Sequence, residues 1–509
     1  MIAISFSTLA KVTKGQLVAQ ESQKELSIEQ LVTDSRAITA NSDLATAFLA
    51  LKGPNFDGHR FAEQVIDQGC QLLIVDHHLA NIEARGVAQL VVKDTRIALG
   101  EIAAFVKAQV APKTVGITGS SGKTTVKEMV AAILSRLGNV LATNGNFNND
   151  IGVPLTLLRL EPHHDFAVIE MGANHIGEIA YTTGLTKPDV AVINNIAAAH
   201  LEGFGDLCGV ARAKGEIFSG LGDNGVALYN QDTQYTSKWQ WRLTDKTVRT
   251  FSCANSSPKS QANCYSEGVT LDSNGCASFT LQTEQGSKAI SLTIPGKHNV
   301  CNAVAAASIA LEFGASLEDI RLGLVQMQPV KGRLNLHHIT DHDSGCKIKL
   351  IDDSYNANLE SAKAAAQLLS TYPGKQILIL GDMGELGNEA RSYHQEVGEY
   401  AKDLAVNTLL SLGVLSQSAS DAFAKGNTNN ENSQHFNQRE LLVSYLTALI
   451  AEQLTAGLQD IAILVKGSRS AHMENVVKDI IQWFEQRKAK QGAHQELAST
   501  DNEIKEGKA

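Results

Sequence analysis

The chain has 509 residues, 43% of them hydrophobic and 19% charged, which is typical of a globular protein of about three domains. Its net charge of −10 argues against a protein dedicated to binding nucleic acid or an anionic membrane. No apolar run approaches the ~18 residues that a membrane-spanning helix needs. The N-terminus lacks the basic and apolar regions of a secretory leader, so we expect neither membrane insertion nor secretion.

Seven cysteines are scattered along the chain, at positions 70, 208, 253, 264, 276, 301 and 346. Their number is odd and no two are spaced as Cys-x-x-Cys, so we expect neither a disulfide framework nor a zinc site. A reducing cytoplasm fits this cysteine usage best. Most of these side chains are expected to be small residues of the core.

The first part of the chain, residues 1–107, is expected to form a small α/β domain. Short apolar runs predict strands near residues 47–51, 72–75 and 90–92. An apolar stretch at 102–106 predicts a helix that leads into the next domain.

A glycine-rich loop opens the second part, residues 108–328. An apolar run before the loop predicts a strand, and a run with helical periodicity follows it. The loop consists of Gly119, Ser120, Ser121, Gly122, Lys123, Thr124 and Thr125. Such a loop presents backbone N–H groups and a helix N-terminus to an anion. The lysine of such a loop reaches the β- and γ-phosphates, and the threonine after it holds Mg²⁺.

The spacing departs from the common nucleotide-binding pattern G-x-x-x-x-G-K-[ST], because Ile117 occupies the position of the first glycine. A chance Gly/Ser turn before a helix is the alternative. The flanking strand and helix are the context that the motif requires, so the sequence predicts a site for ATP or GTP.

Polar residues follow two further predicted strands of the second part. Glu170 ends the strand near 166–169, and His200 lies a few residues after the strand near 190–193. Ligands bind at the carboxyl ends of strands in open α/β sheets, so Glu170 could complete the coordination of Mg²⁺ and His200 could bind a metal. The alternatives are an ordinary strand-end glutamate and a structural or exposed histidine. Lys214 lies in a helical pattern and would by default be solvated.

The polar stretch from about 233 to 292 contains short alternating runs and is expected to be a β-rich insertion. An Ala-rich helix follows it. Asn299 and Asn302 are three residues apart, so they share a face of that helix and could pair with an adenine edge. Capping of the helix by Asn299 is an equally good explanation.

The third part, residues 329–488, has predicted strands near 349–351, 377–380 and 461–465, each followed by a polar or glycine-rich cluster. Strands alternating with helices predict a parallel, doubly wound sheet. The charged tail at 489–509 is expected to be disordered.

Four side chains of the third part are candidates for ligand binding. Arg333 follows a glycine and suits bidentate binding of a phosphate, although a surface arginine is the alternative. Asp353 ends a strand and could bind a ribose hydroxyl or orient Arg333. Lys466 and Arg469 follow another strand and suit a carboxylate or a phosphate.

Taken in order, these motifs resemble the Mur ligase family, the ATP-dependent amide ligases of peptidoglycan precursor synthesis. The likeness runs from about residue 33 to 476. Its irregular glycine loop is the form found in that family. The other segments that carry the likeness are Thr33-Asp34-Ser35-Arg36, Phe56-Asp57-Gly58-His59, Asn146-Phe147-Asn148-Asn149-Asp150, Glu170-Met171-Gly172-Ala173-Asn174, Gly332-Arg333-Leu334-Asn335, Asp353-Ser354-Tyr355-Asn356-Ala357-Asn358 and Lys466-Gly467-Ser468-Arg469.

The resemblance implies a role for each part of the chain. Residues 1–107 would bind a UDP-linked substrate, 108–328 would be the P-loop domain that binds ATP, and 329–488 would be a Rossmann-like ligase domain. A monomer is implied as well.

The resemblance also implies roles for individual residues. Gly119 to Thr124 would bind the phosphates of ATP, and Lys123 would act in catalysis. Thr124 and Glu170 would hold one Mg²⁺, and His200 and a carbamylated Lys214 a second. Asn299 and Asn302 would contact adenine, and Arg333 and Asp353 would contact the rest of the nucleotide. Ser35 and Arg36 would lie at the UDP end of the other substrate. Asn356 and Ala357 would face the incoming dipeptide.

The chain lacks an Asp-Asn-Pro-Arg segment, which favours the activity that adds D-alanyl-D-alanine to UDP-N-acetylmuramoyl-tripeptide. Leu359 stands where relatives usually carry proline, which should loosen the turn without changing the chemistry. Another Mur-type or folylpolyglutamate-type ligase is the first alternative. A nucleotide-gated regulatory protein with a degraded site is the second, although the presence of Lys123, Glu170 and Lys214 speaks against it.

Overall fold

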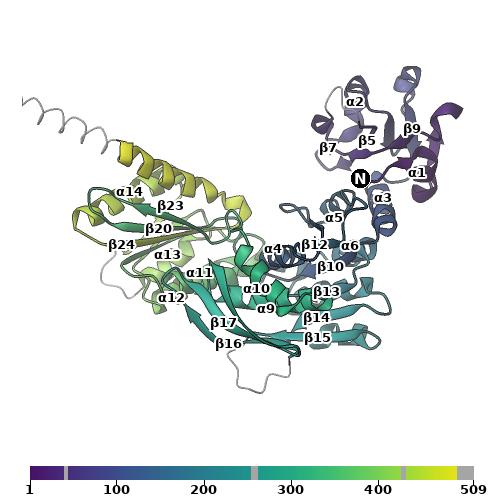
Figure 1. Cartoon of the computed structure of the whole chain (residues 1–509). Coiled ribbons are helices and arrows are strands. Elements are labelled where there is room, and N and C mark those ends of the chain that lie inside the picture. Colours follow the sequence, from purple (N-terminus) through teal and green to yellow (C-terminus); the bar gives the residue numbers. More distant parts are fainter. Residues whose placement is uncertain (39–43, 254–261, 426–431, 490–509) are drawn as a thin grey trace, which may run out of the picture.

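The computed structural model describes residues 1–38, 44–253, 262–425 and 432–489. Figure 1 shows three α/β units, with the central unit between the other two. Each unit is built around its own sheet, of five, nine and six strands along the chain. Most strand pairs are parallel in the sheets of the first and third units. They are also parallel in the central sheet up to its antiparallel extension, which confirms the predicted α/β class.

The sheet of the first unit has the strand order β2-β9-β8-β5-β4. Its parallel strands confirm the three that the sequence predicts and add a fourth, and β2 pairs antiparallel at one edge. The bounds are β2 (Gln16–Val18), β4 (Gln30–Val32), β5 (Thr46–Leu49), β8 (Leu72–Val75) and β9 (Ala88–Val91), with helices α1 (Phe6–Thr13) and α2 (Ala62–Asp67). Helix α3 (Thr95–Val110), capped by Asp94, carries the chain into the central unit.

The central sheet places β10 between β12 and β13, and all three strands are parallel. Their carboxyl ends therefore meet at one edge, where the glycine loop, Glu170 and the residues after β13 lie. The bounds are β10 (Lys113–Thr118), β11 (Val140–Ala142), β12 (Phe166–Glu170), β13 (Val190–Ile193), β14 (Val226–Asn230) and β15 (Thr247–Ser252).

The predicted β-rich insertion is confirmed as an antiparallel extension of the same sheet. It consists of β16 (Cys264–Leu271), β17 (Cys276–Thr283) and β18 (Gly286–Pro295). One face of the sheet packs on α4 (Lys123–Leu134), α9 (His298–Glu312) and α10 (Leu317–Gln326). The other helices of the unit are α5 (Gly152–Leu157), α6 (Glu178–Thr186), α7 (Leu201–Phe204) and α8 (Leu207–Gly215).

The third sheet has the order β19-β20-β24-β21-β22-β23, and only β19 runs antiparallel to its neighbour. Its strands are β19 (Asn335–Thr340), β20 (Lys347–Asp353), β21 (Lys375–Gly381), β22 (Thr408–Leu412), β23 (Ser433–Phe436) and β24 (Asp460–Lys466). Helices α11 (Leu359–Leu369), α12 (Ala390–Asp403), α13 (Gln417–Ala424) and α14 (Arg439–Thr455) surround it, with a last helix over 474–489. Leu359 begins α11 after a capping box made by Asn358 and Ser361.

One disulfide contradicts the expectation that the cysteines are unpaired. Cys253 follows β15 and Cys301 lies in α9, with 5.1 Å between their Cα atoms and a separation of 48 positions in the chain. The spacing gave no hint of the pair, because only packing of α9 against β15 brings the two together. The five other cysteines are free.

The predicted domain limits stay predictions. The limit at 107/108 falls in the last turn of α3, and that at 328/329 falls between α10 and β19. Apart from Ala489, the tail predicted to be disordered lies outside the described residues. Within the described ranges, no helix is long and apolar enough to cross a membrane.

Candidate active site

The glycine loop runs from the end of β10 to the first residue of α4. Gly122 has φ of +74°, and a Cβ atom there would lie 2.3 Å from Asn302 Oδ1 and 2.7 Å from Asn194 Nδ2. Only glycine satisfies both the backbone conformation and this close approach. The loop therefore places the N-terminus of a 12-residue helix at the sheet edge, as an anion site requires.

Lys123 folds back over this loop. Its Nζ donates to the carbonyl oxygen of Gly119 at 2.7 Å. Burial lowers the pKa of Lys123, the nearby Glu170 carboxylate opposes that shift, and the charge of Arg333 adds to it. A polyphosphate at the loop would offset the mutual repulsion of these clustered cations.

Glu170 and Thr124 lie side by side beneath the loop. Thr124 Oγ1 donates to Glu170 Oε2 at 2.9 Å, and Asn148 Nδ2 donates to Glu170 Oε1 at 2.8 Å. Both Glu170 and Thr124 are buried. Hydroxyl and carboxylate oxygens next to a phosphate site are the donor set that Mg²⁺ prefers, so these residues fit that ion.

Lys214 is fully buried in α8, which contradicts the default expectation of a solvated lysine. Its Nζ has no hydrogen-bond partner among the described residues. Burial, followed by the charge of Lys123, holds the pKa of Lys214 well below its usual value. A buried ammonium without a hydrogen-bond partner is costly, so burial favours the neutral amine, although the centre of the Phe204 ring lies 5.4 Å from Nζ.

His200 is the N-cap residue directly before α7 and faces a residue of the third unit. Its Nδ1 lies 2.5 Å from Glu385 Oε2. His200 has φ of +54° and Glu385 has φ of +61°, which non-glycine residues adopt at an energetic cost that is often found at functional sites.

Two asparagines of α9 form a chain of buried amides. Asn194 Nδ2 donates to Asn302 Oδ1 at 3.1 Å, Asn302 Nδ2 donates to Asn299 Oδ1 at 2.8 Å, and Asn299 Nδ2 donates to the oxygen of Pro295 at 2.7 Å. The N-cap of α9 is Lys297, so the alternative that Asn299 caps this helix is wrong. The chain of amides instead ties α9 to the end of β13.

Basic side chains of the third unit face the loop. Lys466 is buried, lies 2.5 Å from Asp353 Oδ2 and donates to the oxygen of Asn356 at 3.0 Å. The guanidinium groups of Arg333 and Arg469 lie 4.5 Å and 5.8 Å from the centre of the Tyr355 ring. These three cations line the same cavity as the glycine loop.

A single cleft of about 940 Å³ joins these groups from the central and third units. Of the residues predicted for the site, it is lined by Ser120, Ser121, Gly122, Lys123, Thr124, Thr125, Glu170, His200, Asn299, Asn302, Arg333, Asp353, Asn356, Ala357, Lys466 and Arg469. Gly119 and the buried Lys214 do not line it. Residues from sequence positions more than 300 apart thus share one cavity.

Three family models together match most of the chain. The Mur ligase family catalytic domain matches residues 27–107, the Mur ligase middle domain matches 117–310, and the Mur ligase glutamate ligase domain matches 332–469. The chain belongs to the Mur ligase family. The order of the three matches is that of the three units in Figure 1.

Relatives of this Mur ligase cover nearly its whole length. UDP-N-acetylmuramoyl-tripeptide–D-alanyl-D-alanine ligase of Escherichia coli is 46% identical over 94% of this chain and 98% of that protein. The ligase of the same name from Bacillus subtilis is 33% identical over 95% of this chain and 99% of that protein. A crystal structure of MurF from Acinetobacter baumannii aligns with a TM-score of 0.84 and 37% identity, covering 95% of this chain and 99% of that one.

Ser35 and Arg36 of this Mur ligase lie outside the cleft, at the carboxyl end of β4 in the first unit. Ser35 is buried. Arg36 pairs with Asp34 through Nε–Oδ1 and Nη2–Oδ2 contacts of 2.9 and 2.7 Å. This pairing lowers the pKa of Asp34 to about 2.

Three residues of this Mur ligase site had no role assigned from the sequence: Asn148 beside Glu170, Glu385 beside His200, and Tyr355 beneath two arginines. All three lie in or near polar clusters that follow strands or carry the family likeness. Their partners are distant in the chain, so no spacing rule could have paired them.

Proposed function

We propose that this Mur ligase joins D-alanyl-D-alanine to UDP-N-acetylmuramoyl-tripeptide and converts ATP to ADP and phosphate. One observation carries the proposal: an anion-binding loop with Lys123, the Thr124–Glu170 pair and the cations of the third unit all face one cleft. The names of the Escherichia coli and Bacillus subtilis relatives support this choice of substrates.

The proposed reaction has two steps. A carboxylate oxygen of the tripeptide attacks the γ-phosphorus of ATP, the bond to the β-phosphate oxygen breaks, and ADP leaves an acyl phosphate behind. The dipeptide amine then attacks the acyl carbon, a tetrahedral intermediate collapses, and phosphate leaves as the amine loses its proton. Two anions meet in the first step, so Lys123 and Arg333 stabilise the charge that builds on the transferred phosphoryl group.

We assign the magnesium sites to residues whose chemistry fits them. Thr124 and Glu170 would hold one Mg²⁺, which would neutralise phosphate charge when bound. His200 and Lys214 would hold the second. For that role the neutral amine of Lys214 would add to CO₂, forming an N–C bond and releasing a proton, so that the side chain would end in an anionic carbamate oxygen. The buried Lys214 amine without a partner supports this assignment.

The remaining assignments divide the substrates among the units. Asn299 and Asn302 would contact adenine, and Arg333 and Asp353 the rest of the nucleotide. Asn356, Ala357, Lys466 and Arg469 would hold the dipeptide, whose carboxylate the two cations suit. Ser35 and Arg36 would hold the UDP end. Because they lie outside the cleft, the first unit must approach the other two when substrate binds.

We further propose that the protein is a cytoplasmic monomer that binds no nucleic acid. ATP and the UDP-linked tripeptide, the two proposed substrates that carry phosphate groups, are nucleotides of the cell interior, which supports the cytoplasmic location. The net charge of −10 supports the absence of nucleic-acid binding.

The deciding experiment measures phosphate release from ATP and Mg²⁺ with UDP-N-acetylmuramoyl-tripeptide, with and without D-alanyl-D-alanine. We expect release to require both substrates and the product to have the mass of the pentapeptide. Release with a glutamate or another amino acid in place of the dipeptide would point to the alternative, a folylpolyglutamate-type or other Mur-type ligase. ADP binding without turnover on any acceptor would refute a ligase.

A further inference from the structure

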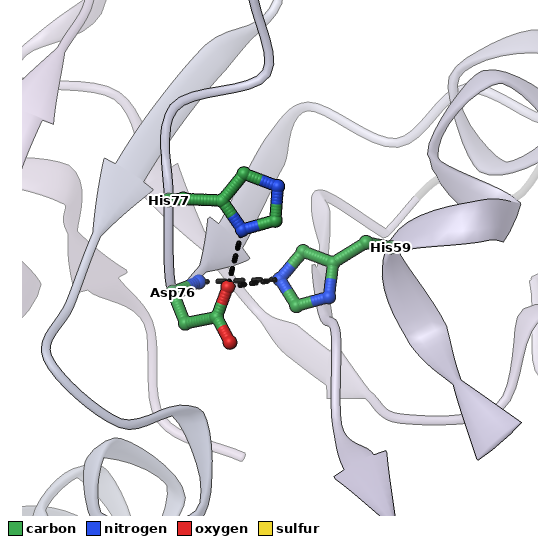
Figure 2. A group of neighbouring side chains, drawn as sticks. All are labelled: His59, Asp76 and His77. Atoms are coloured by element: carbon green, nitrogen blue, oxygen red, sulfur yellow. Dashed lines mark hydrogen bonds and ion pairs between the residues drawn. The ribbon is translucent and has the colours of Figure 1, made fainter. Parts of the chain in front are cut away.

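A group of two histidines and one aspartate lies in the first unit, away from the cleft. Asp76 and His77 follow the last residue of β8, and His59 lies in the short 3-10 turn Gly58–Phe61. Figure 2 shows the three side chains converging on one carboxylate oxygen. None of them lines the cleft or belongs to the proposed ligase machinery.

The Oδ1 atom of Asp76 is the centre of the group. It lies 3.1 Å from His59 Nε2 and 2.5 Å from His77 Nδ1. One ligand atom from each of the three residues lies within 4.8 Å of the other two. The imidazole rings stack with their centres 4.8 Å apart, and each has one nitrogen in contact with the same carboxylate oxygen.

The surroundings of His59 settle which of its nitrogens carries a lone pair. Its side chain is only 6% exposed, and its Nδ1 lies 2.6 Å from Asp57 Oδ1, a carboxylate that can only accept. The proton therefore resides on Nδ1. The other nitrogen, Nε2, accepts the backbone N–H of Asp76 at 3.2 Å.

This arrangement leaves two electron-rich atoms facing each other. The single lone pair of His59 Nε2 accepts the backbone N–H of Asp76, while the electron-rich Oδ1 of the same residue lies 3.1 Å from this nitrogen. A cation shared by Nε2, Oδ1 and His77 Nδ1 would take the place of the N–H on Nε2 and of the hydrogen bond between His77 and Asp76, and all three atoms would donate electron pairs to it.

We propose that His59, Asp76 and His77 form a binding site for a divalent transition-metal ion of the zinc, cobalt or nickel class. Two imidazoles and a carboxylate suit these ions, whereas Mg²⁺ and Ca²⁺ prefer oxygen ligands alone. Asp57 holds the remote nitrogen of His59, which is the outer partner that metal-bound histidines almost always have. Three protein ligands leave a position for water.

The spacing needs little adjustment to hold a metal. Bonds of about 2.0–2.1 Å in a tetrahedral site place ligand atoms roughly 3.3 Å apart. The separation of His59 Nε2 and Asp76 Oδ1 is already 3.1 Å. His77 is 61% exposed in its side chain, so its ring can move without disturbing the core.

The test titrates metal-free protein with Co²⁺ and follows the visible absorption of the bound ion, with Zn²⁺ as competitor. We expect His77→Ala and Asp76→Asn each to bind one equivalent less than the unmodified chain. Asp57→Asn should retain the site and weaken it by about 10–100-fold. The residues of the cleft are the same in every variant, so the difference in Co²⁺ bound counts only the group around Asp76.

The matched control is His78→Ala, because His78 is the exposed neighbour of His77 on the same loop. We expect this variant to bind as much Co²⁺ as the unmodified chain. Equal binding by His77→Ala and the unmodified chain would overturn the proposal and leave a hydrogen-bonded cluster with a protonated histidine. Equal loss in His77→Ala and His78→Ala would overturn the assigned ligand set. Circular dichroism of each variant verifies that the first unit remains folded.

Discussion

Glu385 of the third unit contacts His200 of the central unit, with 2.5 Å between Oε2 and Nδ1. The backbone N–H of Glu202 also donates to the oxygen of Glu385 at 3.4 Å. The contact places a carboxylate of one unit on the imidazole that we assign to the second Mg²⁺. A carboxylate on one imidazole nitrogen orients the ring and makes the other nitrogen a better ligand. The third unit thereby helps to position a residue of the central one.

This contact should make stability depend on pH in acid. The close contact with His200 lowers the pKa of Glu385 below its ordinary value of 4.5. A lowered carboxyl pKa stabilises the folded state above the ordinary pKa, and this stabilisation is lost as pH falls through the lowered one. We expect Glu385→Gln to make Tm depend less on pH below about pH 4.5. Near pH 7, the change of Tm with pH should be nearly the same in both proteins. Parallel pH profiles of Tm for both proteins would contradict the role of this pair.

Removal of either central charge of the cleft should slow the reaction strongly. We expect Lys123→Ala and Glu170→Ala to lose about 10²–10³-fold in kcat, because one lost electrostatic contact to a transition state typically costs about 3–4 kcal/mol. Phosphate release measures the rate, and thermal unfolding verifies the fold. The control is Lys11→Ala, which removes an exposed lysine of α1 and should leave the rate unchanged. A near-normal rate in either cleft variant would remove that residue from the machinery.

Carbamylation of Lys214 predicts a labelled adduct. Burial holds the pKa of this lysine well below its usual value, which favours the neutral amine that reacts with CO₂. We expect ¹³C-bicarbonate to give a carbamate signal in the NMR spectrum of the unmodified chain and none in Lys214→Arg, because a guanidinium stays charged. Activity should rise with added bicarbonate after CO₂ is removed. An identical spectrum for both proteins would exclude the modification.

Gly122→Ala tests the packing behind the phosphate loop. The new Cβ atom would displace Asn302 Oδ1, which lies 2.3 Å from its position. An unsatisfied buried amide costs about 1–3 kcal/mol, so we expect affinity for ADP to fall about tenfold or more. Gly457→Ala is the matched control, since Gly457 also has a positive φ, of +79°, but no atom within 4 Å of the new Cβ. Gly457→Ala should bind ADP as tightly as the unmodified chain. If both variants lost the same affinity for ADP, crowding at the loop would not be the cause.

The disulfide predicts a stability difference between oxidised and reduced protein. A bridge between residues 48 positions apart restricts the unfolded chain, so we expect reduction of Cys253–Cys301 to lower the free energy of unfolding by about 2–4 kcal/mol. Denaturant titration with and without reductant measures the change. The variant Cys253→Ser should show the lower stability in both buffers. If reductant lowered the stability of Cys253→Ser as much as that of the unmodified chain, the stability change would come from another cysteine.

Local pattern was sufficient to predict the glycine loop with its flanking strand and helix, and the most apolar strands of each unit. The strand, glycine loop and helix from Lys113 to Leu134 are adjacent in the chain, so their spacing alone predicts the structure that forms. The apolar runs near 72–75, 166–169 and 461–465 are likewise strands, because a parallel sheet buried on both faces requires nearly continuous apolar side chains.

The sequence by itself determined the α/β class, the phosphate loop and the family likeness, because each depends on residues that are close in the chain or on motifs in a fixed order. Only the tertiary structure decided that Lys214 is buried without a hydrogen-bond partner, that Glu385 contacts His200 and that Cys253 pairs with Cys301. Burial and contacts between distant segments arise from the packing of units against one another, and no local periodicity encodes them. The same reason hid the group at His59, Asp76 and His77, whose members come from two separate turns.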